Sequence, residues 1–344
     1  MKQFIDLRSD TITKPTEAMR KVMYEAEVGD DVYKEDPTAN ELERYAAELL
    51  GKEAALYVTS GVMGNQICLN VLTQPGDEVI CEKDAHIFQY ESGSPAWLSG
   101  IQMGLVEGVR GVFTAEQIKP YIRPASAYYM ARTKVIEIEN THNRAGGTIN
   151  PIENIKAINA LAKENSLYMH LDGARIWNAS VASGVEVKEY AKYFDSVSCC
   201  LSKGLGAPIG SIIAGSKDFI KQAFRVRKAL GGGMRQVGII ASAGLYALKN
   251  NISRLSEDHE KAKMLAATIN KLESLEIDME RVQTNILIFK AKNMSLEDAL
   301  ARTKEKGLLL SEGTVGSMRA VTHMDVSFEQ TEKACKILEE VFGK

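Results

Sequence analysis

The sequence is poor in cysteine, with five among 344 residues. No two of them are spaced as Cys-x-x-Cys, which argues against a zinc ribbon or a thioredoxin-type redox site. An odd number of scattered cysteines is typical of free thiols in a reducing compartment rather than of a disulfide framework. We therefore expect a cytoplasmic protein in which Cys199 and Cys200 are small buried strand residues.

The sequence also lacks a long apolar run and an excess of charge of one sign. Because no stretch of about 18 apolar residues occurs, we predict no transmembrane helix, and the charged N-terminus is unlike a signal peptide. The 42 Lys and Arg residues nearly balance 45 Asp and Glu residues, for a net charge of −3. Such a balance does not drive a chain onto nucleic acid or an anionic membrane. We expect neither as a partner.

Short apolar segments alternate with helix-like segments through most of the chain. The composition, 45% hydrophobic and 25% charged, is that of an ordinary globular protein. Strands are predicted over residues 55–59, 78–81, 134–138, 168–171 and 196–200. Helices are predicted over residues 64–72, 151–164 (with Asn150 and Pro151 at its start) and 234–248. This alternation is typical of an α/β fold with a mostly parallel central sheet.

The pattern changes near residue 250. Further on, helices are predicted over residues 251–275, 296–306 and 328–342, and strands over 285–289 and 317–321. We therefore expect residues 1–250 to form an N-terminal segment and a large domain, and residues 251–344 a small α+β domain. His259 lies in a charged helix and is predicted to be solvated, whereas His170 and His323 are predicted to be structural.

Polar residues follow the predicted strands, at the edge where α/β sheets bind ligands. Lys203 lies among small residues, where a partly desolvated amine would be nucleophilic, although it could equally be a solvated loop lysine. Asp172 lies 31 residues earlier, about one βαβ crossover. It could pair with a protonated pyridine nitrogen, as in pyridoxal phosphate (PLP) enzymes, or cap a helix.

Two further segments also follow predicted strands. Ser60, Gly61 and Val62 open a predicted helix, where backbone amides can bind phosphate, although small residues also form ordinary turns. His86 follows another strand and could stack on an aromatic cofactor ring or be purely structural. No set of residues has the spacing of metal ligands, so we name no metal ligand.

Seven motifs occur in a characteristic order. They are IDLRSDTITK at residues 5–14, VGDDVYKEDP at 28–37, SGVMGN at 60–65, ENTHNRAGG at 139–147, HLDGARIWN at 170–178, LSKGLGAPIGS at 201–211 and GGGMRQ at 231–236. Through them the chain resembles, over nearly its whole length, the low-specificity L-threonine aldolases. These are fold type I PLP enzymes of the aspartate aminotransferase superfamily.

The resemblance implies a role for each matching residue. For the cofactor it implies Lys203 as the Schiff-base lysine, Asp172 at the pyridine nitrogen and His86 stacked on the ring. It also implies Arg175 near the phenolic oxygen and Arg235 reaching the phosphate of a neighbouring subunit's cofactor. The residues implied at the phosphate are Ser60, Gly61, Val62 and Ser202. For the substrate it implies Ser9, Tyr33, Arg175 and Arg319, the last through a two-pronged ion pair with the carboxylate. His86 or His142 is expected to act as the base.

The implied reaction is cleavage of L-threonine and L-allo-threonine to glycine and acetaldehyde. Two alternatives keep the cofactor: action on aryl β-hydroxy amino acids, and β-elimination. One residue departs from the family pattern, because Val62 occupies a position where the family usually has threonine. Since Arg235 would serve a neighbour, the resemblance also implies a homo-oligomer, at least a dimer and in the family a tetramer.

Overall fold

The largest layer of the computed structural model, which describes residues 4–343, is a seven-stranded sheet of order β2-β8-β7-β6-β5-β3-β4. Its strands are β2 (Ala54–Val58), β3 (Asp77–Glu82), β4 (Gln102–Val106), β5 (Arg132–Glu139), β6 (Tyr168–Asp172), β7 (Ser196–Cys200) and β8 (Ser211–Gly215). Within this sheet β8 runs antiparallel to both of its neighbours, and the other pairings are parallel. The predicted α/β fold with a mostly parallel sheet is confirmed, while β4 and β8 were not predicted.

Alternate residues of the strands build a separate core on each face of the sheet. Tyr57 and Ile80 lie in one apolar cluster, whereas the adjacent Leu56 and Val79 lie in the other. Because successive side chains of a strand point to opposite faces, the apolar runs are explained by burial on both sides. One core includes residues of α2 (Pro37–Leu50), α7 (Ile152–Glu164), α8 (Ile176–Ser183), α9 (Val187–Ala191) and α11 (Gly238–Asn250). The other includes residues of α3 (Gly61–Leu72) and α10 (Lys217–Ala229).

Helix starts differ from the prediction by a few residues. Helix α3 begins at Gly61, because the Ser60 hydroxyl accepts a hydrogen bond from the Met63 amide and caps the first turn. Helix α7 begins at Ile152 with Pro151 as its cap, and α11 begins at Gly238. The remaining helices of this part are short: α1 (Glu17–Tyr24), α4 (His86–Gln89), α5 (Ser94–Ser99) and α6 (Ala115–Ile118).

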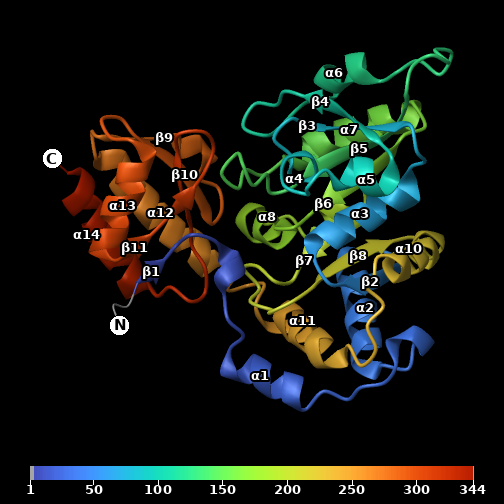
Figure 1. The fold of residues 1–344 in the computed structure, drawn as a ribbon, viewed down its shortest axis with the longest axis horizontal. Coiled ribbons are helices and arrows are strands. Elements are labelled where there is room, and N and C mark those ends of the chain that lie inside the picture. The colour runs from blue at the N-terminus through green and yellow to red at the C-terminus, as the bar shows by residue number, and fades with distance from the viewer. Residues whose placement is uncertain (1–3, 344) are drawn as a thin grey trace.

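The C-terminal part has its own sheet and its own core, and lies beside the large sheet in Figure 1. Its antiparallel strands follow the order β12 (Ser311–Glu312), β13 (Met318–Val321), β10 (Ile286–Ala291) and β9 (Leu275–Ile277). Helices α12 (Leu255–Lys271), α13 (Leu296–Lys306) and α14 (Phe328–Phe342) complete it, the last two with the predicted bounds. The N-terminal strand β1 (Ile5–Asp6) pairs in parallel with β11 (Leu308–Leu309), so the start of the chain joins this part.

The prediction that His259 is solvated is wrong. His259 is buried in α12, where the Asn178 amide donates to its Nε2 at 3.2 Å, and burial lowers the pKa of the ring to about 4. It belongs to an apolar stripe with Leu255, Ala262 and Leu265, at helical spacing. Two charged residues of this helix, Asp258 and Lys261, are buried as well and pair with each other at 2.9 Å. His170 and His323 are both buried and hydrogen-bonded.

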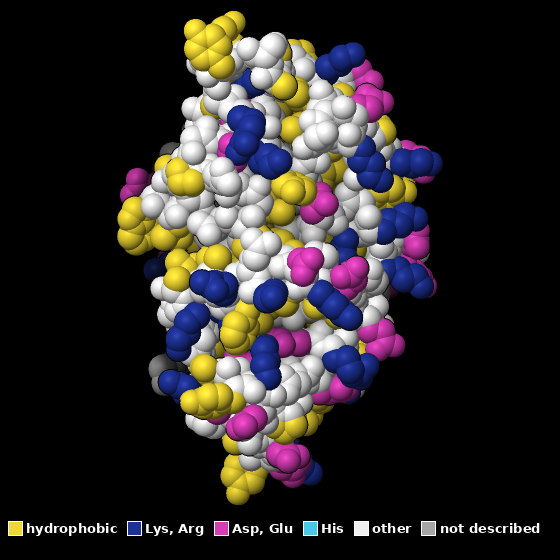
Figure 2. Space-filling view, turned by 90° about the vertical axis from the view of Figure 1, so that its right-hand side faces the viewer, with side chains coloured by type: hydrophobic (Ala, Val, Ile, Leu, Met, Phe, Trp, Pro, Cys, Tyr) yellow, Lys and Arg dark blue, Asp and Glu magenta, His cyan; other side chains and the backbone are white. Residues whose placement is uncertain are grey.

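The surface is mixed in charge. On the face shown in Figure 2, basic and acidic side chains are interspersed, without a large field of one sign. Among residues 4–343, no helix has the length and apolar character needed to cross a bilayer.

Candidate active site

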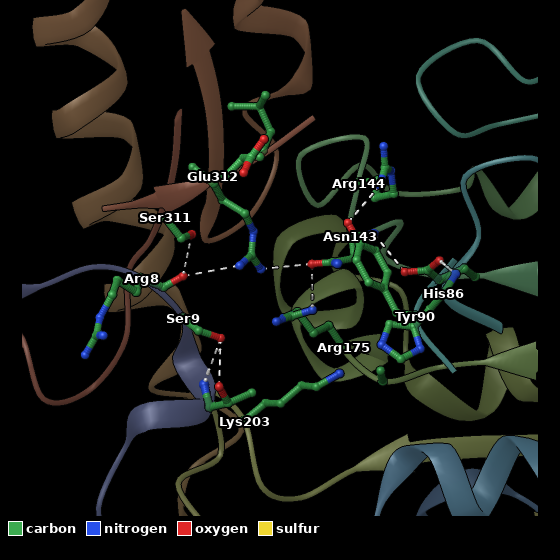
Figure 3. A pocket seen from close by; sticks show the side chains of 16 residues that line it. Arg8, Ser9, His86, Tyr90, Asn143, Arg144, Arg175, Lys203, Ser311 and Glu312 are labelled. Carbon is green, nitrogen blue, oxygen red and sulfur yellow. Dashed lines mark hydrogen bonds between the residues drawn. The ribbon is translucent and has the colours of Figure 1, made fainter. Parts of the chain in front are cut away.

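A cavity of about 440 Å³ opens between the large sheet and the C-terminal part of the chain (Figure 3). It brings together five of the residues singled out from the sequence: Ser9, His86, Arg175, Lys203 and Arg319. His86 begins α4, just after β3, and Lys203 lies in the loop between β7 and β8. Ser9 follows β1, and Arg319 lies on β13. The cavity therefore depends on segments from both ends of the chain.

Lys203 projects into this cavity from a tightly held loop. Its carbonyl oxygen accepts hydrogen bonds from the Gly206 amide at 2.8 Å and from the Thr13 hydroxyl at 3.2 Å. Gly206 has a positive φ of 79°, and a Cβ there would meet Met324 Sδ at 2.4 Å. Within residues 4–343 the Lys203 ammonium makes no ion pair. The loop thus offers an amine that no carboxylate neutralises.

Asp172 ends β6 and is buried. Its oxygens accept hydrogen bonds from the Ala174 amide at 3.0 Å and from the Asn65 side-chain amide at 2.8 Å. No Lys or Arg of the described chain pairs with it. Charges are rarely buried without a counter-charge. The carboxylate is therefore suited to a cationic group of a ligand.

His86 is held by two carboxylates. Its backbone amide donates to Glu139 at 2.8 Å, and its Nδ1 donates to the buried Glu91 at 2.9 Å. Burial lowers the pKa of the ring, but the hydrogen bond to Glu91 and the charges of Asp172 and Glu139 outweigh it and hold the pKa above 6.5. His86 is therefore oriented by its partners, and their charges raise its pKa from the ordinary histidine value.

The ligand atoms of His86, Glu91 and Asp172 lie within 4.8 Å of one another, a spacing that could also hold a metal ion. Protein donors already engage both carboxylates, because Asn65 donates to each of them. His86 also directs a nitrogen at Glu91. We therefore assign these residues to an organic ligand rather than to a metal.

Arg175 already has its carboxylate partner. Its Nε and Nη2 donate to the two oxygens of buried Asp10 at 2.8 and 2.7 Å. Burial alone would raise the pKa of Asp10, but the charge of Arg175 outweighs it and holds that pKa far below its usual range. This two-pronged pair ties the segment after β1 to the start of α8.

Arg319, in contrast, has no carboxylate partner within residues 4–343. Its Nη2 donates to Asn143 Oδ1 at 2.9 Å, its Nη1 donates to the Arg8 carbonyl at 3.2 Å, and its Nε is without a partner. Burial and the neighbouring charge of Arg175 lower its pKa to about 10. Asn143 Oδ1 also accepts from Arg175 at 3.4 Å, so one amide oxygen lies between the two guanidinium groups. The cavity presents an uncompensated cation, which suits a carboxylate.

The predicted phosphate residues lie outside the set that lines this cavity. Ser60, Gly61 and Val62 form the start of α3, and Ser202 precedes Lys203. A Cβ at Gly61 would meet Cys200 Sγ at 2.8 Å. Only glycine therefore lets this end of α3 approach β7 so closely. The backbone amides of the first helical turn can donate hydrogen bonds to an anion there.

Three predicted residues are not brought to the cavity in the single chain. His142 is buried, its Nε2 donates to Glu82 at 3.1 Å, and its Nδ1 accepts from the Ala145 amide at 3.3 Å. Tyr33 is 71% exposed on the surface. Arg235 is exposed as well and pairs with Asp30 at 3.0 Å.

Four residues that hold this site together had no role predicted from the sequence: Asp10, Asn65, Glu91 and Asn143. Three of them, Asp10, Asn65 and Asn143, fall inside the quoted motifs, and this membership was the available signal. Their pairing partners, however, lie on other elements.

The chain is similar to known proteins over most of its length. A family model described as beta-eliminating lyase matches residues 6–292. Low specificity L-threonine aldolase from Escherichia coli is 43% identical over 95% of this chain and 96% of its own length. Low-specificity L-threonine aldolase 1 from Arabidopsis thaliana is 42% identical over 94% of this chain and 92% of its own length.

Solved structures share the fold at lower identity. Threonine aldolase from Leishmania major superposes with a TM-score of 0.84 at 19% identity, covering 98% of this chain and 99% of that one. A structure of SPT with PLP has a TM-score of 0.75 at 16% identity, covering 98% of this chain and 87% of that one. The chain therefore belongs to the beta-eliminating lyase family, and within it to the low-specificity L-threonine aldolases.

Proposed function

We propose that this protein is a PLP-dependent lyase that cleaves L-threonine and L-allo-threonine to glycine and acetaldehyde. One observation carries the proposal: a single cavity combines the Lys203 amine with the Arg319 guanidinium, neither of which pairs with a carboxylate within residues 4–343, and adjoins the buried carboxylate of Asp172. An amino acid and a cationic aromatic cofactor would together satisfy all three groups. The relatives at 42–43% identity carry the same activity in their names.

The residues present fit PLP. Asp172 is a buried carboxylate with no basic partner in residues 4–343, and it would pair with the protonated pyridine nitrogen. The His86 ring would stack on the cofactor, Lys203 would bind it covalently, and Arg175 would lie near its phenolic oxygen. The start of α3, with Ser60, Gly61, Val62 and Ser202, would hold the phosphate. When bound, PLP supplies an electron sink for the pair released when the Cα–Cβ bond breaks.

The substrate carboxylate would be oriented by two groups. Arg319 offers a charged fork, and Ser9, which follows the Arg8 carbonyl that Arg319 contacts, offers a hydroxyl. Fixing the carboxylate determines which bond at Cα is held in the reactive direction, so orientation contributes much of the rate enhancement. With the amine and the carboxylate both anchored, L-amino acids should be strongly preferred over D-amino acids.

We propose that His86 accepts the proton of the substrate β-hydroxyl group. This ring lines the cavity, and its fixed contact with Glu91 would stabilise the imidazolium that forms. His142, the other candidate, directs Nε2 at Glu82 and is 1% exposed, so a role for it would need a bridging water. A proton returned to Cα then yields glycine, and acetaldehyde leaves.

Weak discrimination between the threo and erythro substrates follows from the same arrangement. No side chain of the described cavity clamps the β-carbon as Arg319 would clamp the carboxylate. A misfit of one methyl group costs only about 1–3 kcal/mol. Both diastereomers are therefore expected to react.

The test uses purified protein supplied with PLP. L-threonine and L-allo-threonine should each release acetaldehyde and glycine, and borohydride should fix the cofactor on the peptide that contains Lys203. 2-Oxobutanoate and ammonia in place of acetaldehyde and glycine would overturn the proposal in favour of β-elimination. Cleavage of an aryl β-hydroxy amino acid alone would overturn the substrate assignment.

We further propose a homotetramer with at least a dimer as the active unit. Arg235 and Tyr33 are exposed in the single chain, and so are the large aromatic side chains Tyr24, Trp97 and Tyr128. Exposed apolar surface of this kind is typical of interfaces. A fully active monomer in light-scattering and activity measurements would contradict this proposal.

The division at residue 250 and the cytoplasmic location are also proposals. The separate core of the C-terminal part supports a small domain over residues 251–344, joined by the N-terminal strand β1. All five cysteines are free thiols, which supports a reducing compartment.

A further inference from the structure

Asn65 makes three hydrogen bonds from one buried side chain, and all of them end on titratable groups. Its Nδ2 donates to Asp172 at 2.8 Å and to Glu91 at 2.9 Å, and its Oδ1 accepts from His170 Nε2 at 3.2 Å. We propose that Asn65 is a positioning residue that holds the carboxylate of Asp172 and the Glu91–His86 pair in one frame around the cofactor ring. This inference rests on the proposed function.

The chemistry of the three partners requires an amide at this position. Carboxylates only accept hydrogen bonds, so the NH₂ group of Asn65 must face Glu91 and Asp172. The carbonyl oxygen must then face His170, whose Nδ1 accepts from the Ser196 hydroxyl at 2.9 Å. An aspartate would add a third carboxylate to this group, and an alanine would leave buried acceptors without donors.

His170 contributes no positive charge to the cluster. It is buried, and burial lowers its pKa to about 4, so the ring is neutral at physiological pH. Asn65 is neutral as well. Asp172 thus receives hydrogen bonds without a counter-charge, and its negative charge is left for the ligand that binds in front of it. A lysine or arginine in place of Asn65 would compete for that charge.

Helix α3 packs close enough to the sheet for the Asn65 side chain to reach Asp172 at the end of β6. A Cβ at the preceding residue, Gly64, would meet Ser198 Oγ at 2.6 Å and Ile213 Cγ2 at 3.1 Å. Only glycine therefore allows α3 to pack this tightly on β7 and β8. The same helix begins at the predicted phosphate site, so Asn65 links the phosphate end of the cofactor to the ring-nitrogen end.

Loss of the Asn65 amide should change cofactor binding and kcat more than it changes substrate binding. Asp172 would keep only the Ala174 amide as a donor and Glu91 would lose one of its donors, so both carboxylates would be less firmly held, whereas Arg319 and Ser9 would be untouched. Cofactor affinity and kcat should each fall about tenfold to a hundredfold, the usual effect of losing a hydrogen bond to a charged group. The KM for L-threonine should change less than threefold or so, because carboxylate binding remains intact.

The experiment compares Asn65→Ala and Asn65→Asp with Asn70→Ala in the PLP-loaded protein. Asn70 lies on the same helix and donates to the Leu98 carbonyl at 3.3 Å and to the Ser99 hydroxyl at 3.1 Å, away from the cofactor carboxylates. Measured are the PLP dissociation constant by titration, the visible absorbance and circular dichroism of the bound cofactor, kcat, KM and the melting temperature. The Asn65 variants should change the cofactor spectrum and its affinity, and Asn70→Ala should change neither.

Two results would overturn the inference. One is an Asn65→Ala protein with the wild-type spectrum and kcat once saturated with PLP. The other is an equal change in Asn70→Ala, which would indicate a purely structural effect. Failure of the proposed function is distinguishable: wild-type protein that binds PLP without releasing acetaldehyde refutes the aldolase reaction, while the spectral comparison still decides the role of Asn65. Wild-type protein that binds no PLP overturns both.

Discussion

Replacing Arg319 by glutamine should weaken substrate binding without weakening the fold. Arg319 is held by Asn143 Oδ1 at 2.9 Å and the Arg8 carbonyl at 3.2 Å, while its Nε has no partner. Burial and the charge of Arg175 lower its pKa to about 10, which means that the folded protein disfavours its positive charge. Removing this charge relieves that cost, so the melting temperature should stay constant or rise.

The magnitude follows from the lost ion pair. Hydrogen bonds between charged groups contribute about 1.5–3 kcal/mol each, and a guanidinium fork makes two of them to a carboxylate. Because glutamine keeps one neutral donor, the net loss is about 3–4 kcal/mol, or roughly a hundredfold to a thousandfold in kcat/KM. KM should rise because the carboxylate is bound less tightly, and kcat should fall as well because the fixed carboxylate sets which bond at Cα is reactive.

The assay measures kcat, KM for L-threonine and the melting temperature, with Arg123→Gln as the matched control. Arg123 is half-buried like Arg319, but it already pairs with buried Glu78 at 3.3 and 3.4 Å and lies outside the cavity. Its replacement should lower stability, because Glu78 loses its partner, and should leave KM unchanged. The reasoning is refuted if Arg319→Gln retains the wild-type KM, or if it destabilises the protein as much as the control does.

Three further changes test other parts of the site and the fold. Val62→Thr should tighten PLP binding by about 0.5–1.5 kcal/mol through an added hydroxyl, measured as a two- to tenfold lower Kd, and an unchanged Kd contradicts the idea. Glu91→Gln removes a charge that raises the pKa of His86, so the rising limb of the kcat/KM profile should move to lower pH, and an unmoved limb argues against His86 as the base. Glu137 is fully buried on β5, neither of its oxygens has a hydrogen-bond partner among the described residues 4–343, and burial together with Asp172 and Glu139 raises its pKa well above 4.5. A carboxyl whose pKa is raised in the folded state makes the protein less stable as the pH rises above the unfolded pKa of 4.5. Glu137→Leu should therefore stabilise the protein by about 1–3 kcal/mol at pH 8 and by less at pH 4, as measured by denaturant unfolding. Equal effects at the two pH values would contradict this assignment.

The sequence predicted the part of the site that depends on strand ends. Lys203, Asp172 and His86 each follow an apolar run, and parallel strands bring their carboxyl ends to one edge. The strands themselves were predictable because burial on both faces makes them nearly continuous apolar runs. Two strands of the large sheet, β4 and β8, were not predicted from this pattern.

Contacts between distant segments could not be predicted in the same way. Asp10 and Arg175 are 165 residues apart, and nothing in local periodicity relates them. The pairing of β1 with β11 and the burial of His259 against α8 likewise depend on how helices and sheets pack. His142 was expected at the substrate, but its ring turns toward Glu82, a direction that the motif alone does not encode.

The charge balance of the cavity explains why Asn143 suits its position better than an aspartate would. Its amide oxygen lies between Arg175 and Arg319 and accepts a hydrogen bond from each. A carboxylate there would pair with Arg319 and compete directly with the substrate carboxylate for the same guanidinium. Asp10 already neutralises Arg175, so the asparagine can orient the second arginine without cancelling its charge. The positive charge that makes Arg319 costly to the folded protein is thus the charge left available to bind the amino acid.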